Sequence, residues 1–231
     1  MPLYTADALI LRTYKLAEAD RIVVFLTRDR GKKRGVAKGA RRPRSRFAAA
    51  LEPMTEVRLA YFEKESRELV GVNYAETVRS PLALAMRMDG PSDGGSHRSS
   101  SPEALEYIGY FAELLDEWAQ DADADDRLYR LGASMLDALS AGAPVEPLAR
   151  YFEYWLLRLQ GVYPEARGTL SGEAMAFLTA SRSVTPQQVG GVPAARGVLK
   201  ELEQVHRGLI AMHLEKHLKS DRVLRELRRH P

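Results

Sequence analysis

Apolar and polar residues alternate in short runs over the first 79 positions, which is the period of β-strands. Five such runs, rich in branched and aromatic residues, lie at residues 7–14, 21–27, 32–38, 55–62 and 68–76. In the fourth run, Val57, Leu59 and Tyr61 are expected to face a core. Glu56 and Arg58, which alternate with them, are expected to face solvent. Five short strands with a long loop after the third predict a small closed barrel, and the five-stranded OB-fold fits best.

After residue 79 the apolar positions recur every three or four residues, which is typical of packed helices. Helices are expected at residues 80–88, from Pro102 onward with Ser101 as its cap, at 125–140, at 147–160 and at 194–217. The stretch at 89–102 is dominated by Gly, Ser and Pro and is expected to form a mobile loop. The sequence therefore predicts an α+β protein: an OB-fold barrel over residues 1–79, followed by an all-α domain over 80–231.

Composition narrows the class of protein. The chain has 231 residues, 45% of them hydrophobic, which is enough to bury a core. It has no cysteine, which excludes disulfides and cysteine-ligated zinc. Its first residues do not have the pattern of a signal peptide, and no apolar run reaches the length of a membrane span. We therefore expect a soluble, cytoplasmic protein with no membrane partner.

Charge is distributed unevenly along the chain. Residues 1–50 hold thirteen Lys and Arg against four Asp and Glu, while residues 51–231 hold twenty-one against twenty-seven. Ten of the basic residues fall within positions 28–46, beside the single acid Asp29. A basic surface that only maintains solubility is one interpretation. Solubility does not require concentrated charge, however, so the clustering favours a polyanionic partner.

The third strand and the loop after it carry the candidate contacts to a phosphate backbone: Lys32, Lys33, Arg34, Lys38, Arg41, Arg42, Arg44 and Arg46. Gly35 and Gly39 would allow another backbone to come close. The nearest aromatic candidates for base stacking are Tyr4, Tyr14 and Phe47, although Phe47 could equally fill the barrel. Contact with roughly six phosphates would give a log–log salt slope of about −4 on single strands.

Other chemistry is weakly indicated. The acidic segment that begins at Asp121 resembles a calcium loop but lacks the required glycine and glutamate, so a solvated loop is expected. His206, His213 and His217 would share one stripe of a helix, where packing explains them better than a metal site. No phosphate-binding loop or nucleophile elbow is present. We therefore expect no metal, no cofactor and no catalytic residue.

Four short motifs carry a resemblance to a known family. They are "EADR" at residues 18–21, "TRDRGK" at 27–32, "GVAKGARRP" at 35–43 and "LEP" at 51–53. Together they resemble the amino-terminal domain of the RecO family of recombination mediator proteins. The resemblance implies a protein that is not an enzyme, that binds single- and double-stranded DNA and that anneals complementary strands. With RecR, it would help RecA displace single-stranded DNA-binding protein. The resemblance also implies that the protein is associated with the nucleoid.

The resemblance continues more faintly in the helical part. There it implies that Arg150 captures the acidic tail of single-stranded DNA-binding protein, with an ordinary surface arginine as the alternative. The carboxy-terminal segment matches as well, so the DNA surface could extend to Lys216, Lys219, Arg222 and Arg225, or these could belong to a solvated helix end. Many relatives carry a four-cysteine zinc site after the helix at 147–160. This chain has no cysteine there, so that region is expected to be held by packing alone.

Two other classes of function remain open. A protein-interaction adaptor would use the same basic face to bind an acidic protein partner. A nuclease is a third reading, but no group of carboxylates is visible that would hold its metal ion. Replacing Arg41, Arg42 and Arg44 with alanine separates the first two readings, because only a DNA-binding protein should then lose affinity for oligonucleotides.

Overall fold

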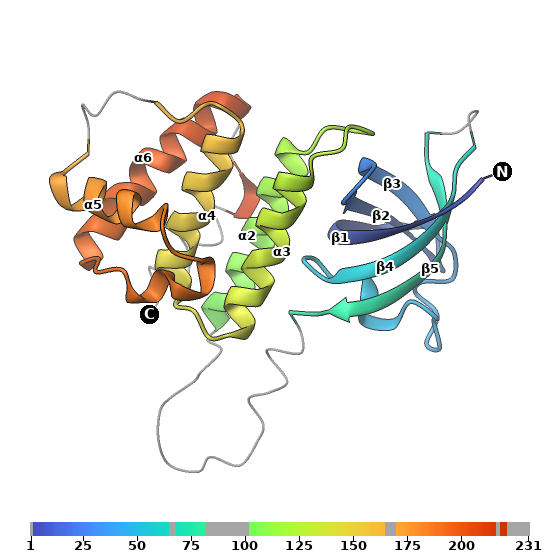
Figure 1. The fold of residues 1–231 in the computed structure, drawn as a ribbon. Helices are drawn as coiled ribbons and strands as arrows, with labels where there is room; N and C mark the ends of the chain where they lie inside the picture. Colours follow the sequence, from blue (N-terminus) through green and yellow to red (C-terminus); the bar gives the residue numbers. More distant parts are fainter. Residues whose placement is uncertain (1, 65–67, 82–101, 165–169, 216–217, 221–231) are drawn as a thin grey trace, which may run out of the picture. The chain divides into compact units, whose positions relative to one another are not determined.

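A computed structural model of the chain describes residues 2–64, 68–81, 102–164, 170–215 and 218–220 (Figure 1). The first part contains β1 (Leu3–Leu16), β2 (Asp20–Thr27), β3 (Gly31–Ala37), η1 (Ala48–Leu51), β4 (Glu56–Phe62) and β5 (Val70–Arg79). The second contains α2 (Pro102–Trp118), α3 (Asp126–Ser140), α4 (Val145–Leu159), α5 (Gly172–Ser181), η3 (Pro186–Gly191) and α6 (Arg196–Leu214). Among the described residues, no helix is both long and apolar enough to cross a membrane.

Contacts divide the chain into two compact units. One comprises residues 1–89 and 108–133, and the other comprises residues 90–107 and 134–231. The first unit therefore groups the strands with most of α2 and the start of α3. The domain boundary expected after residue 79 stays a prediction.

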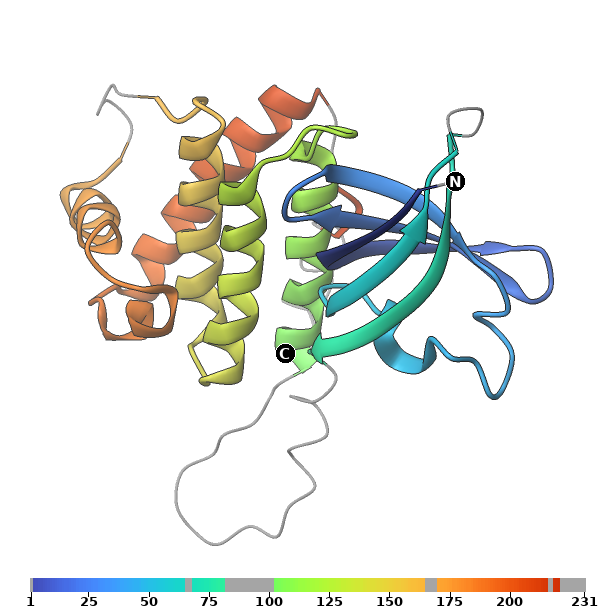
Figure 2. The same ribbon diagram turned by 45° about the vertical axis from the view of Figure 1, so that its right-hand side comes forward.

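The five strands, blue to teal in Figures 1 and 2, close into a barrel in the order β1-β2-β3-β5-β4. All neighbours are antiparallel except β3 and β5, which pair in parallel through Gly35–Val70, Val36–Gly71 and Ala37–Val72. The long strand β1 pairs with both β2 and β4, and a register shift between Ile10 and Arg12 bends it. The predicted α+β class, a five-stranded barrel followed by helices, is confirmed.

The barrel interior is filled by small and branched side chains with a few rings. Val57, Leu59 and Tyr61 are fully buried in it, and Arg58 is exposed, as the alternation predicted. The expectation for Glu56 is wrong, because it is 9% exposed. A register shift between Glu56 and Val57 interrupts the alternation there. The Glu56 carboxylate pairs with Arg79 and accepts a 2.8 Å hydrogen bond from the hydroxyl of Tyr129.

Most of the expected helices are present with slightly different ends. α2 begins at Pro102, α4 covers Val145–Leu159, and α6 ends at Leu214, where Glu215 takes a left-handed conformation with φ 53°. The helix α5 was not predicted. Two of its four buried residues, Ala174 and Ser181, are small, so its apolar pattern is weak, although Ser171 caps its start. The helix expected at 80–88 and the loop expected at 89–102 lie almost wholly outside the described residues.

Candidate nucleic-acid interface

The basic loop between β3 and η1, residues 38–47, is fastened to the turn between β1 and β2. The backbone N–H of Gly39, at φ +72°, donates to Oδ1 of Asp20 at 2.8 Å. The backbone N–H of Arg41 donates to the carbonyl of Ala19 at 2.9 Å. The Arg41 guanidinium donates to the carbonyls of Ala17 and Glu18 at 3.0 and 2.8 Å. These bonds join two of the motifs found in the sequence and hold the loop in a defined position.

Six basic residues of this strand and loop are exposed, and we call them the cationic surface: Arg34, Lys38, Arg41, Arg42, Arg44 and Arg46. None of the six pairs with a carboxylate in the part of the chain that the structure describes. The guanidinium of Arg41 donates to two carbonyl oxygens, and the guanidinium of Arg46 lies 5.1 Å from the ring centroid of Phe47. Their charges are therefore not neutralised by described carboxylates.

Lys32 and Lys33 differ from these six residues. Nζ of Lys32 donates to the backbone carbonyl of Asp116 at 2.6 Å and lies 3.8 Å from Oδ1 of Asp121. Nζ of Lys33 lies 2.7 Å from Oε1 of Glu63. Their side chains are only 11% and 14% exposed. Both lysines bind oxygen atoms of the protein itself, so we do not include them in the cationic surface.

The acidic segment after α2 supplies part of this internal neutralisation. Asp126 accepts a 2.8 Å hydrogen bond from Nε of Arg28, and the backbone of Ala122 donates to the carbonyl of Lys32 at 3.0 Å. Asp125 accepts from the backbone N–H of Leu128 at the start of α3. The segment was expected to be a solvated loop. Residues 121–124 are exposed, as expected, and the segment also borders the hairpin of β2 and β3. Among the described residues, no cluster of His, Asp and Glu is placed to hold a metal ion.

Gly35 serves the barrel itself. A Cβ atom at this position would lie 2.6 Å from Cγ2 of Val72 and 2.9 Å from Cγ2 of Val70. The missing side chain lets β3 pack against β5 at the parallel pairing. Gly35 was expected to let the backbone of a ligand come close, but the strand that comes close to it is β5 of the protein itself. Gly39 instead supplies a residue in the left-handed conformation.

The three expected stacking residues lie in different surroundings. Phe47 is 1% exposed within the barrel core, which supports its alternative role of filling the barrel. The ring of Tyr4 is half-buried, with the guanidinium of Arg30 4.2 Å from its centroid. Tyr14 is 46% exposed, and its hydroxyl accepts a hydrogen bond from Arg12. Only Tyr14 presents an open ring.

A groove of about 400 Å³ on the barrel lies beside the cationic surface, and sequence reasoning missed it. Lys38 and Arg46 line it together with a third cation, Lys64. Its apolar lining includes Val36 and the half-buried ring of Phe62. No pattern of spacing reveals it, because residues from three separate strands meet there. The signal that could have indicated it is Phe62, the last residue of an alternating strand, followed two positions later by a lysine.

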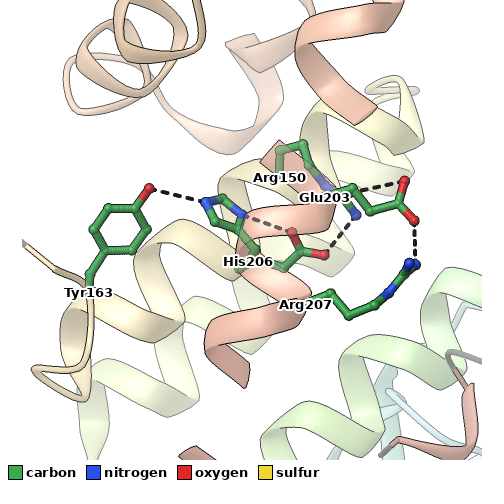
Figure 3. A network of polar contacts seen from close by, with 6 residues as sticks. Arg150, Tyr163, Glu203, His206 and Arg207 are labelled. Carbon is green, nitrogen blue, oxygen red and sulfur yellow. Dashed lines mark hydrogen bonds and ion pairs between the residues drawn. The ribbon is translucent and has the colours of Figure 1, made fainter. Parts of the chain in front are cut away.

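Arg150 was expected to capture a partner's carboxylate, but its guanidinium is already paired inside the fold. Its side chain is 4% exposed, its Nη2 atom lies 2.7 Å from Oε1 of Glu153, and its Nη1 atom lies 3.4 Å from Oε2 of Glu203 (Figure 3). The alternative of an ordinary surface arginine is therefore wrong, and the tail-binding role stays a prediction that this burial does not favour. The neighbouring acidic residues on α4 and α6 neutralise it inside the helical unit.

The same network continues to His206 (Figure 3). Nδ1 of His206 lies 2.9 Å from Oε2 of Glu153, and its Nε2 lies 3.3 Å from the hydroxyl of Tyr163. Burial lowers the pKa of His206, against the opposing effect of its hydrogen bond to Glu153. The start of the region beyond α4 was expected to be held by packing alone. It is held in part by this buried polar network.

Most of the carboxy-terminal residues that were candidates for DNA contact are not among the described residues. Lys216, Arg222 and Arg225 lie outside the described residues, while Lys219 is described and exposed. Their part in a DNA surface stays a prediction.

Comparison with known proteins identifies the family. Residues 1–81 match the family described as recombination protein O N terminal, and residues 99–167 match recombination protein O C terminal. The DNA repair protein RecO of Symbiobacterium thermophilum is 33% identical over 206 residues, covering 86% of this chain and 70% of the relative. The chain belongs to the RecO family.

Other RecO relatives agree with this assignment. RecO of Desulforudis audaxviator is 34% identical over 202 residues, again with 70% of the relative covered. RecO of Koribacter versatilis is 36% identical over 160 residues, which is 69% of this chain and 59% of the relative. The chain thus spans less than two thirds of some of the RecO proteins that it matches.

Proposed function

We propose that this RecO-family protein is a DNA repair and recombination mediator that binds single- and double-stranded DNA through its cationic surface and anneals complementary strands. One observation supports this most. The fold neutralises Lys32 and Lys33 with its own carboxylates, yet no carboxylate of the described residues pairs with the six exposed cations of the same stretch. Unneutralised like charges repel one another, and a phosphate backbone would relieve that repulsion.

The mechanism is charge neutralisation. Two single strands repel each other because each phosphate carries a negative charge. Cations placed along one strand lower the local potential that the second strand meets, so complementary bases can approach and pair. This role needs no catalytic group, and we propose that the protein is not an enzyme.

Family membership supports the wider assignment of partners. The protein would act with RecR on DNA coated by single-stranded DNA-binding protein, helping RecA to load, in the cytoplasm at the nucleoid. Arg150 is not offered as the contact for the partner's acidic tail, because two glutamates already occupy its guanidinium.

The test combines a triple variant with a matched control. Arg41→Ala, Arg42→Ala and Arg44→Ala together remove three charges from the cationic surface. Arg127→Ala, Arg130→Ala and Arg196→Ala remove three exposed charges elsewhere. Binding of a labelled single strand is measured over a series of salt concentrations, with thermal unfolding to confirm the fold.

The wild type should show a log–log salt slope of about −4, and the surface variant a slope shallower by about 2. The control should match the wild type, and annealing of strands coated with single-stranded DNA-binding protein should fall only in the surface variant. Equal binding by the surface variant and the wild type at low salt would overturn the proposal. Retained DNA binding with loss of an acidic protein partner would support the adaptor function instead.

A further inference from the structure

The strand registers place three residues side by side on the outer face of the barrel. Gly71 of β5 pairs with Val36 of β3 on one side and with Phe62 of β4 on the other. Their neighbours along each strand, Tyr61 and Val72 among them, are buried in the core. Because successive side chains of a strand point to opposite faces, the three residues face outward.

Gly71 leaves a hollow in the middle of this row. A Cβ atom there would meet nothing within 4 Å, and the residue does not have the positive φ that favours glycine. Neither packing nor backbone conformation therefore requires glycine. Val36 and Phe62 stand two strand spacings apart, about 9–10 Å. A planar ring can enter this space and contact an aliphatic side chain on one side and an aromatic ring on the other.

The rim of the hollow is cationic. Lys38 comes two positions after Val36 and Lys64 two positions after Phe62, so each lysine continues the outward-facing side of its strand. Arg46 lines the groove from the loop after β3. Among the residues that the structure describes, no Asp or Glu lines the groove, and Asn73, the next outward residue after Gly71, offers an amide. An apolar slot bordered by three cations fits an aromatic base whose sugar is flanked by two phosphates. This is the chemistry of a nucleotide within a strand.

We propose that this groove holds one unpaired nucleobase of single-stranded DNA, stacked on Phe62 above Gly71, with its flanking phosphates on Lys38, Arg46 and Lys64. The inference rests on the proposed DNA binding and adds a preference to it. A base inside a duplex is stacked and paired, so it cannot enter the slot. Duplex DNA would contact the cations alone, and only a single strand would gain the stacking contact.

Two variants test the slot without changing its charge. Gly71→Val fills the hollow at a strand position where the added atoms meet nothing, so the fold should be kept. Phe62→Leu removes the ring. Tyr74→Leu is the matched control, because Tyr74 is an aromatic residue of β5 that is 44% exposed and does not line the groove. Thermal unfolding of each variant shows whether the barrel is intact.

The probes are an oligothymidylate, the same oligomer with abasic sites and a duplex of equal length. Gly71→Val and Phe62→Leu should each weaken binding of the intact oligomer by about tenfold. Their affinity for the duplex should change by less than twofold, and the salt slope should stay that of the wild type. The wild type should bind the abasic oligomer more weakly than the intact one. Each of the two variants should bind the abasic and the intact oligomers with equal affinity.

The outcomes separate this inference from the proposed function. If the wild type binds no oligonucleotide, the proposed function itself fails. If the wild type binds DNA and Gly71→Val binds the intact oligomer equally well, only the slot is refuted. Equal loss on single strand and duplex, or equal binding of abasic and intact oligomers by the wild type, also refutes the slot.

Discussion

The carboxylate of Asp20 accepts a hydrogen bond from the backbone N–H of Gly39, with 2.8 Å between Oδ1 and N. This contact connects the end of the first turn to the start of the basic loop, where Gly39 has φ +72°. Since Asp20 is bonded to a loop whose cations we propose to contact DNA, its replacement has two opposing effects on binding. Loss of its negative charge favours DNA, whereas loss of the hydrogen bond frees a loop that must be ordered on binding.

A pair of variants separates these effects. Asp20→Asn removes the charge and keeps an acceptor for Gly39, and Asp20→Ala removes both. We expect the alanine variant to bind a single-stranded oligomer about fivefold more weakly than the asparagine variant, which corresponds to about 1 kcal/mol for the hydrogen bond. Fluorescence anisotropy at one salt concentration measures the ratio. Equal affinities would show that the loop keeps its position without this bond.

Gly31 should tolerate no side chain. Its φ is +68°, and a Cβ atom would overlap the backbone of Asp123. The substitution Gly31→Ala therefore combines left-handed strain with a clash against main-chain atoms, which cannot move aside as a side chain can. We expect the free energy of unfolding to fall by at least about 2 kcal/mol. Gly208→Ala in α6 is the control, because nothing lies within 4 Å of its Cβ and alanine favours a helix.

Tyr129 is predicted to contribute more to stability than Tyr74, although each donates its hydroxyl to a glutamate. Tyr129 is 3% exposed and its partner Glu56 is 9% exposed, while Tyr74 is 44% exposed and bonds to the exposed Glu76. Tyr129→Phe leaves a buried carboxylate oxygen without its donor, which costs about 1–3 kcal/mol. Tyr74→Phe should cost about 0.5 kcal/mol or less. Urea unfolding of both variants gives the comparison, and equal losses would contradict it.

Local patterns predicted the elements well because their causes are local. The alternation in β4 identified Val57, Leu59 and Tyr61 as core residues, and the turn residues delimited β2 and β3. The parallel pairing of β3 with β5 could not be deduced in this way, since it joins segments that are 35 residues apart, as in Gly35–Val70. The burial of Glu56 depends on Tyr129, which lies 73 residues further along the chain.

The site was predicted in part for the same reason. Charge density along the sequence identified the basic stretch, but it does not show which cations meet an acid after folding. Lys33 is neutralised by Glu63 and Lys32 by Asp116, and both acids come from later elements. The pairing of Arg150 could not be predicted from the sequence either, because its partner Glu203 lies on a helix 53 residues further along the chain. Sequence patterns predict charge, and tertiary contacts decide its availability.

The buried network of the helical unit should make stability depend on pH. His206 is fully buried between Glu153 and Tyr163, with Arg150 also close, and burial lowers its pKa below 6.5. In the unfolded chain the pKa is about 6.5. As the pH falls below that value, the unfolded chain takes up a proton that the folded chain does not. The free energy of unfolding should therefore be highest above pH 6.5 and fall by up to about 1.4 kcal/mol per pH unit below it.

A His206→Gln variant isolates this contribution. Glutamine retains hydrogen-bonding atoms near Glu153 but does not titrate, so the variant lacks the pH dependence that His206 supplies. Urea unfolding of both proteins at pH 7.5, 6.5 and 5.5 gives the difference in stability between them. We expect the wild type to be the more stable protein at pH 7.5, because it keeps its contacts to Glu153 and Tyr163. The difference should shrink toward pH 5.5. A constant difference over this range would mean that His206 accepts its proton in the folded state as easily as in the unfolded chain, which burial beside Arg150 opposes.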